Sequence, residues 1–291
     1  MGAEWKVPAS QELVRPRPLR RLVDPLRERN FTYAAYDAFL DRLADPRFRV
    51  VPLRELRSAP RDRALVGLRH DVDERLDSAL RLARAEHARG LRATYFVLHT
   101  ARYYREPGLL DDLRRLQDLG HEVGWHNDLV TLELVYGVDP VRYLDRELAR
   151  LRGAGIDVVG TAAHGSIWCH LLGFHNNRFF VDFPEARPRS GVVEVRGQER
   201  RITQARLADF GFAYEAYHLD EDHYFSDSRF DSGGRRWHPE ELDLERLRPS
   251  ESLIVLLHPC HWASSLAARY GRLAGRLTAK AGELRERRRV L

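Results

Sequence analysis

Short apolar runs alternate with amphipathic segments from residue 64 onward. The run 64–68 is too short for a helix and leads at once into charged residues. Residues 74–90 place apolar side chains at helical spacing and end in a glycine. The same rhythm predicts further strands at 93–98, 122–125, 158–163 and 253–257, with helices at 107–119 and 141–151. Such an alternation is typical of parallel strands joined by crossover helices.

Each predicted strand of this series ends on an ionisable side chain. These side chains are Asp71 and Asp73, His99, His126, His164 and His258. Because parallel strands with crossover helices bring their carboxyl ends to one face, we expect these groups to gather there. The pattern favours a (β/α) barrel with a site at this rim. A doubly wound open sheet would gather them similarly, but the chain has no glycine-rich phosphate loop.

Two regions lie outside this alternation of predicted strands and helices. Residues 1–60 are predicted to form a helical prelude packed on the barrel of residues 61–291, with an amphipathic helix near 36–43 and an extended segment at 49–53. Residues 165–250 are predicted to be an insertion.

Aromatic residues are frequent in the inserted region. Its candidate strands are 191–196 and 212–217, and its predicted loops are 224–228 and 231–238. An insertion of this kind in a regular barrel usually shapes a substrate cleft. The candidates to stack on a sugar ring are Trp168, Tyr224 and Trp237, with core packing as the alternative for each.

Composition narrows the classes of function. The 291-residue chain has a formal net charge of +5, but only Lys6 and Lys280 are lysines, so 46 of its 48 basic residues are arginines. Most of these arginines are interspersed with Asp and Glu, which is typical of solvated helix faces rather than of a nucleic-acid surface. No apolar run reaches the roughly 20 residues that span a bilayer, and no signal peptide is recognisable. We therefore expect a cytoplasmic protein that acts on a small molecule or glycan and not on nucleic acid.

Asp71 and Asp73 form the central pair of candidate site residues. They are two residues apart at a strand end, so their carboxylates point the same way and repel each other. A bound divalent cation resolves this repulsion, with Asp73 and His126 as oxygen and nitrogen ligands of the kind that zinc accepts. Asp71 is then placed to act as a general base, and His258 to protonate a leaving group. A helix N-cap with a salt bridge is the alternative for the two aspartates alone.

Several segments, taken in order, resemble the motifs of the polysaccharide deacetylase family (carbohydrate esterase family 4). They are Arg69-His-Asp-Val-Asp73, Gly90-Leu-Arg-Ala-Thr-Tyr-Phe96, Gly120-His-Glu-Val-Gly-Trp-His126 and a final Leu-Leu-His258-Pro. The resemblance covers roughly residues 64–164 and 252–262. It implies a distorted (β/α) barrel of about seven parallel strands and metal-dependent hydrolysis of an N-acetyl or related amide. By the same resemblance, Asp71 is the base, Asp73 and His126 are metal ligands, and His258 is the acid.

The chain departs from the family pattern in two places. The usual second histidine, four residues after the first, falls on Val130, which cannot bind a metal. His164 is the first candidate for the missing third ligand and Asp128 is the second. The family's arginine and proline segment, which orients the base, is replaced here by Ala163-His-Gly-Ser166. His164 is therefore also a candidate to hold Asp71, which would leave Asp128 as the ligand.

These observations lead to one main expectation and two alternatives. We expect a metal-dependent hydrolase that removes an acyl group, with acetyl as first choice, from an amino sugar, a glycan precursor or a glycosylated small molecule. Zinc is the first choice of metal, with cobalt, nickel or manganese as alternatives. The alternatives for function are hydrolysis of a non-sugar amide and a catalytically silent carbohydrate-binding barrel. Two adjacent carboxylates argue against the silent barrel, because it has no physical need of them.

Overall fold

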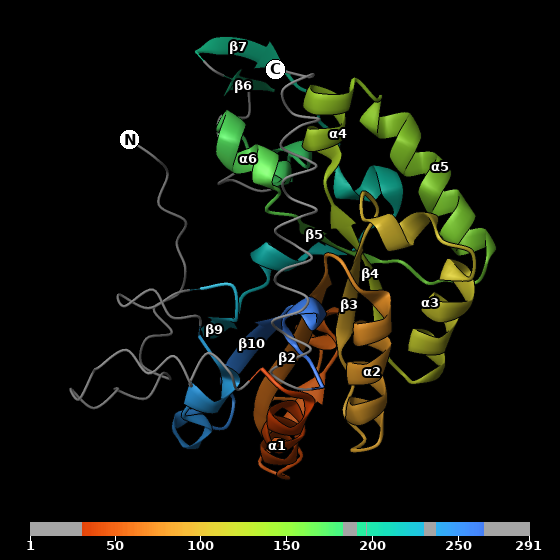
Figure 1. Ribbon diagram of the computed structural model, residues 1–291. Coiled ribbons are helices and arrows are strands. Elements are labelled where there is room, and N and C mark those ends of the chain that lie inside the picture. The colour runs from red at the N-terminus through yellow and green to blue at the C-terminus, as the bar shows by residue number, and fades with distance from the viewer. Residues whose placement is uncertain (1–30, 183–190, 196, 230–236, 265–291) are drawn as a thin grey trace, which may run out of the picture.

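A parallel sheet forms the centre of the molecule (Figure 1). The computed structural model describes residues 31–182, 191–195, 197–229 and 237–264. Eight strands in this part of the chain belong to the sheet, in the order β8-β5-β4-β3-β2-β10-β9, with β1 paired to β2. The prediction of a distorted (β/α) barrel with about seven parallel strands is confirmed, and the barrel takes the form of a curled sheet covered by helices.

The apolar runs of the sequence become the strands of this sheet. Their bounds are β1 Phe48–Val51, β2 Ala64–Val72, β3 Thr94–Leu98, β4 Glu122–Asn127, β5 Gly160–Ala163, β8 Tyr214–Glu215, β9 His223–Ser226 and β10 Ser252–Leu257. β2 is central because β10 pairs along one of its edges, and β1 followed by β3 along the other. All nine residues of β2 are buried, as expected for a parallel strand that is covered on both faces.

The described residues form six α-helices. They are α1 Tyr33–Leu43, α2 Leu76–His87, α3 Leu109–Asp118, α4 Leu129–Tyr136, α5 Pro140–Gly153 and α6 Ile167–Leu172. The three predicted helices that follow strands correspond to α2, α3 and α5, with ends that differ by one to three residues. Among the described residues, no helix is both long enough and apolar enough to cross a membrane.

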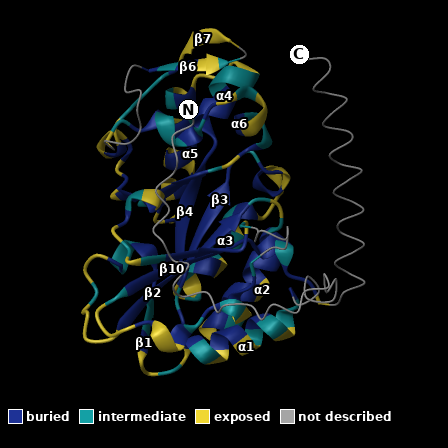
Figure 2. Cartoon of the chain, turned by 90° about the vertical axis from the view of Figure 1, so that its left-hand side faces the viewer, coloured by how far each residue is buried: buried dark blue, intermediate teal, exposed yellow. Residues whose placement is uncertain are grey.

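The strands of the sheet and the outer faces of the helices differ in how far they are buried (Figure 2). The central strands are buried, whereas exposed residues lie on the outer faces of the helices and on β7 (Gln198–Arg201). β7 pairs antiparallel with β6 (Val192–Val195), and these two strands form a small sheet apart from the main one. The predicted strand at 191–196 is therefore present as β6, although residue 196 itself is outside the described residues.

Other predictions for the inserted region need correction. The predicted loop at 224–228 is wrong, because β9 occupies His223–Ser226 and pairs with β10. The candidate strand at 212–217 is present only as the two residues of β8, and a 3-10 turn, η7 (Ala216–His218), follows it. α4 was not expected because it is apolar in most of its positions and has no helical period to detect. The prelude residues 1–30 and most of the predicted loop 231–238 lie outside the described residues.

A buried carboxylate ties the helices to the sheet on the side away from the strand ends. Glu86 on α2 accepts hydrogen bonds from the hydroxyl groups of Tyr36 on α1 and Tyr95 on β3, and lies 2.8 Å from Nε2 of His70 on β2. Glu86, His70 and Tyr95 are all fully buried. Burial raises the pKa of the Glu86 carboxyl, but His70 and the other donors outweigh it and hold the pKa at about 2.

We predict that this carboxylate makes the stability of the fold depend on pH. The pKa of Glu86 is depressed from 4.5 to about 2 on folding, so the ionised group stabilises the protein above pH ~4.5. That contribution, roughly 3 kcal/mol, is lost as the pH falls toward 2. Glu86→Gln should therefore lower the free energy of unfolding at pH 7 by about 3 kcal/mol, and the difference from wild type should shrink in acid. Denaturant unfolding at pH 7, 5 and 3 measures it, and a difference that does not change with pH would contradict the prediction.

Candidate functional site

The carboxyl ends of four strands bring ionisable side chains together. Asp71 lies within β2 and Asp73 directly follows it, while His126 lies within β4. His164 directly follows β5, and His258 directly follows β10. Because β2 lies between β3 and β10 in the sheet, its end is central to this group. The structure thus brings the predicted site residues to one rim.

Asp73, His126 and His164 form a cluster with a ligand-like arrangement. Asp73 Oδ1 lies 3.3 Å from His126 Nε2 and 4.0 Å from His164 Nε2. One ligand atom from each of the three residues falls within 4.8 Å of the other two. The other ring nitrogen of His126, Nδ1, lies 2.8 Å from the carbonyl oxygen of Ala162. A proton on Nδ1 donated to that carbonyl leaves the Nε2 lone pair directed at Asp73.

Asp128 lies behind His164 and not in the cluster itself. Its carboxylate accepts hydrogen bonds of 2.8 Å from both Thr100 Oγ1 and Asn176 Nδ2. Asp128 Oδ1 also lies 3.4 Å from His164 Nδ1, while the opposite nitrogen of the ring faces Asp73. This geometry separates the two candidates for the third ligand, since His164 faces the cluster and Asp128 orients it.

Asp71 is held by an arginine of its own strand. Arg69 Nε and Nη2 donate to the two carboxylate oxygens of Asp71, both at 2.8 Å. Burial raises the pKa of Asp71, but Arg69 and His126 outweigh it and hold the pKa below its usual value. The Arg69 guanidinium is itself buried, 4.4 Å from the centre of the Tyr217 ring. The alternative in which His164 holds Asp71 is therefore not needed, because Arg69 supplies that contact.

His258 is paired with a carboxylate that sequence reasoning missed. His258 Nδ1 lies 2.6 Å from Asp227 Oδ1, and its backbone N–H donates to Oδ2 at 2.9 Å. His261 Nδ1 lies 2.8 Å from the same Oδ2. Burial lowers the pKa of His258, but Asp227 outweighs it and raises the pKa to about 9. His258 therefore carries a proton at neutral pH, and its Nε2 lies 3.8 Å from Asp73 Oδ2.

Sequence reasoning missed Arg69 and Asp227 for different reasons. Arg69 precedes Asp71 by two positions on one strand, so the alternation of side chains placed it on the same face. That signal was present in the sequence. Asp227 follows β9, which was predicted as loop, so its place at a strand end was hidden.

The predicted aromatic residues lie in varied surroundings. Tyr224 on β9 is 7% exposed and belongs to a buried apolar cluster. Trp237 packs against buried Phe225 with ring centres 5.9 Å apart, and Trp168 is partly buried against the core. Tyr217, on η7 beside Arg69, is 37% exposed. Tyr217 is thus an aromatic side chain next to Asp71 and Arg69 that retains exposed surface.

The remaining histidines of the strand region have structural partners. His99 stacks on Trp125 with ring centres 4.5 Å apart, and its Nε2 accepts the backbone N–H of Asp128. His70 lies against Glu86 on the helix side of the sheet. His121 Nδ1 accepts the backbone N–H of Ala93. These contacts hold the rings of the three histidines against neighbouring segments of the fold.

Comparisons with known proteins found likenesses at the level of structure. No protein-family model and no curated protein matches the chain. Among solved structures, a CE4 family pseudoenzyme from Bacillus anthracis matches with 16% identity and a TM-score of 0.35, covering 74% of this chain and 60% of that one. A mutant of that pseudoenzyme with restored enzymatic activity matches with 15% identity and a TM-score of 0.35, over 74% of this chain and 63% of the mutant.

A family 4 carbohydrate esterase from Bacillus anthracis also matches, with 13% identity and a TM-score of 0.33. That match covers 87% of this chain and 86% of the esterase. The chain thus spans less than two thirds of the length of the pseudoenzyme structures and most of the length of the esterase. At these identities and TM-scores the matches give no information about the function of this chain, which has to be inferred from its own side chains.

The geometry of the cluster predicts a selective loss of metal binding. His164→Ala should abolish stoichiometric binding of zinc or cobalt, because it removes a nitrogen that faces Asp73. Asp128→Asn should weaken binding by about 10- to 100-fold, as expected for a group that orients a ligand. Asp227→Asn is the matched control, because Asp227 pairs with His258 and His261. Metal analysis of the purified variants after reconstitution measures these effects. Metal loss in Asp227→Asn alone would place the metal at a second group of possible donors, Asp227, His258 and His261.

Proposed function

We propose that this protein is a metal-dependent hydrolase that removes an N-acyl group, with acetyl as first choice, from an amino sugar or a sugar-bearing small molecule. The observation that carries the proposal is the pairing of two proton-transfer groups around one cluster. Asp71, held by Arg69, lies 3.5 Å from His126, and His258, held by Asp227, lies 3.8 Å from Asp73. A base and an acid on one donor cluster are what hydrolysis of an amide needs.

The donor set fits a divalent cation. Asp73 Oδ1 is buried and makes no hydrogen bond with any described residue, although it faces two imidazole nitrogens. Two imidazoles and one carboxylate are the donors of many catalytic zinc sites. Asp73, His126 and His164 would hold the cation, which when bound polarises the scissile carbonyl and lowers the pKa of water. We retain zinc as the first choice because two of the three donors are nitrogens.

Asp71 is the residue suited to take a proton from the attacking water. The low pKa of its carboxyl keeps it ionised at neutral pH, and the two bonds from Arg69 fix the direction of its oxygens. Because Arg69 occupies both oxygens along one edge of the carboxylate, the remaining lone pairs accept the proton. A carboxylate fixed in this way loses little entropy when the substrate binds.

His258 is the residue suited to give a proton to the departing amine. An amine is a poor leaving group until it is protonated, so an acid must be aimed at it. Asp227 binds Nδ1 of His258, which leaves the Nε2 proton directed toward Asp73. The buried carboxylate of Asp227 also stabilises the imidazolium, so His258 keeps its proton until it transfers that proton to the amine.

We predict that the two proton-transfer residues affect turnover and not metal content. Asp71→Asn and His258→Asn should each lower kcat for release of acetate from N-acetylated amino sugars by about 10²- to 10⁴-fold. Both variants should keep the metal content of wild type, whereas His126→Ala should lose it. The assay measures acetate from N-acetylglucosamine and its oligomers with metal-reconstituted protein. Binding of these sugars by metal-loaded wild type without any turnover would instead support the silent barrel.

Arg69 is predicted to act by positioning Asp71. Arg69→Gln removes both bonds to the carboxylate, so kcat should fall by about 100-fold while metal content stays unchanged. Arg69→Lys should restore part of the loss, because an ammonium supplies the charge without the two-pronged geometry. If Arg69→Gln unfolds the protein, the lysine variant still tests the idea. Equal kcat for Arg69→Lys and wild type would show that the paired geometry is not required.

A further inference from the structure

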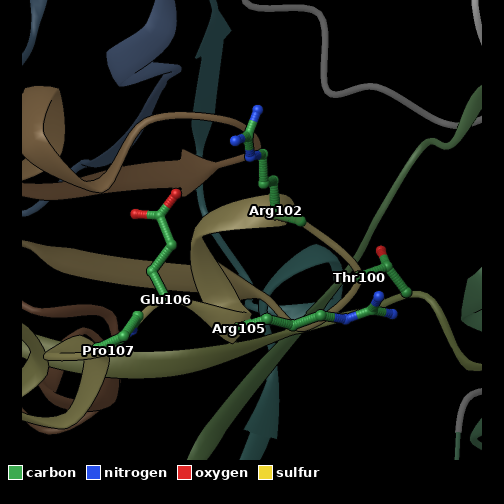
Figure 3. A pocket seen from close by; sticks show the side chains of 6 residues that line it. Thr100, Arg102, Arg105, Glu106 and Pro107 are labelled. Carbon is green, nitrogen blue, oxygen red and sulfur yellow. The ribbon is translucent and has the colours of Figure 1, made fainter.

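A hollow of about 530 Å³ opens at residues 100–107 (Figure 3). Its lining residues are Thr100, Ala101, Arg102, Arg105, Glu106 and Pro107. Thr100 links the hollow to the cluster, because its hydroxyl donates to Asp128, which lies 3.4 Å from His164. Asp128 therefore connects Thr100 of the hollow with His164 of the cluster.

The two arginines of the hollow are set on one face of a short helix. Arg102 and Arg105 begin and end the 3-10 turn η4 (Arg102–Arg105). Residues three apart in a 3-10 helix lie on the same side, so both guanidinium groups belong to the exposed face. Tyr103 and Tyr104, between them, are buried at 5% and 4% exposure. In Figure 3 the Arg105 side chain extends toward Thr100, whereas the Arg102 side chain points away from it, so an anion between them would have to draw the two guanidinium groups together.

η4 is anchored next to Asp73. The Tyr103 hydroxyl donates to the carbonyl oxygen of Val72 at 2.6 Å and accepts the backbone N–H of Leu98 at 2.7 Å. Val72 is the last residue of β2 and immediately precedes Asp73. The backbone of η4, which carries both arginines, is therefore held next to Asp73.

The charge of this face is not neutralised within the described chain. Arg102 and Arg105 form no ion pair or hydrogen bond with the described residues, whereas Arg114 and Arg115 on the next helix each pair with an aspartate three residues earlier. Glu106 is the one acidic residue lining the hollow, so the lining keeps a net positive charge. Two like charges on one face repel each other, and an anion between them relieves that repulsion.

We propose that Arg102 and Arg105 bind a phosphate group carried by the substrate. The proposal rests on the proposed function in taking the substrate to be a sugar, and it narrows the substrate class to phosphorylated or diphosphate-linked amino sugars. A single arginine fork suffices for a carboxylate, as Arg69 shows with Asp71. Two exposed guanidinium groups match a phosphate, which offers more acceptor oxygens and more charge.

Calorimetric binding with sugars that lack an acyl group tests this site without turnover. The probes are glucosamine, glucosamine 1-phosphate, UDP-glucosamine and inorganic phosphate, titrated into the full-length, metal-reconstituted protein. Wild type should bind at least one phosphorylated sugar about tenfold or more tightly than glucosamine. Stronger binding of glucosamine 1-phosphate identifies a sugar phosphate, and stronger binding of UDP-glucosamine identifies a diphosphate-linked sugar.

Paired variants separate this site from general attraction by a basic protein. Arg102→Gln with Arg105→Gln should abolish the preference for phosphate, while affinity for glucosamine stays within about twofold of wild type. Arg81→Gln with Arg84→Gln is the matched control, because these residues are also three apart, on the exposed side of α2. Equal loss in both double variants, or no preference for phosphate in wild type, would overturn the proposal.

The two proposals fail in different ways. If the protein does not release acetate from N-acetylated sugars but keeps the arginine-dependent preference for phosphate, the hydrolase is wrong and the phosphate site stands. If acetate is released but binding ignores phosphate, the hydrolase stands and the phosphate site is wrong.

Discussion

The site depends on the cost of placing two carboxylates at the buried end of one strand. Asp71 and Asp73 are two residues apart, and neither is fully solvated. Unpaired carboxylates in such a place would repel each other and be protonated. The fold avoids this by giving each a different partner, since Arg69 neutralises Asp71 and the imidazoles of His126, His164 and His258 surround Asp73. The two carboxylates therefore have different surroundings, a guanidinium at Asp71 and imidazoles at Asp73.

Much of this arrangement could be predicted from the sequence, because it follows from the period of apolar residues. A buried parallel strand is a continuous apolar run, and the ionisable residue that ends the run marks its carboxyl end. β2, β4, β5 and β10 all carry that signal, so the sequence predicts that Asp71, Asp73, His126, His164 and His258 lie close together. α2 and α5 were equally clear from their apolar stripes, and the Asp139 side chain also caps the start of α5.

The parts that could not be predicted depend on contacts between distant segments. β9 is four residues long and contributes few apolar positions, so its pairing with β10, and not its own pattern, makes it a strand. The role of Asp227 follows from that pairing. The orientation of Asp128 likewise depends on distant segments, because Thr100 and Asn176 hold its carboxylate behind the His164 imidazole. No spacing in the sequence encodes those two bonds.

The register of β5 explains how a third donor arises although Val130 cannot bind metal. Val130 lies in the first turn of α4 and is fully buried in the apolar core, so this helix contributes packing where a ligand was expected. β5 pairs Ala162 with His126, and the backbone N–H of His164 donates to the carbonyl of Asn127 at 2.8 Å. That register carries His164 just past the strand end, where its ring turns back toward Asp73. A histidine that follows β5 therefore faces Asp73, whereas residue 130 on α4 packs in the apolar core.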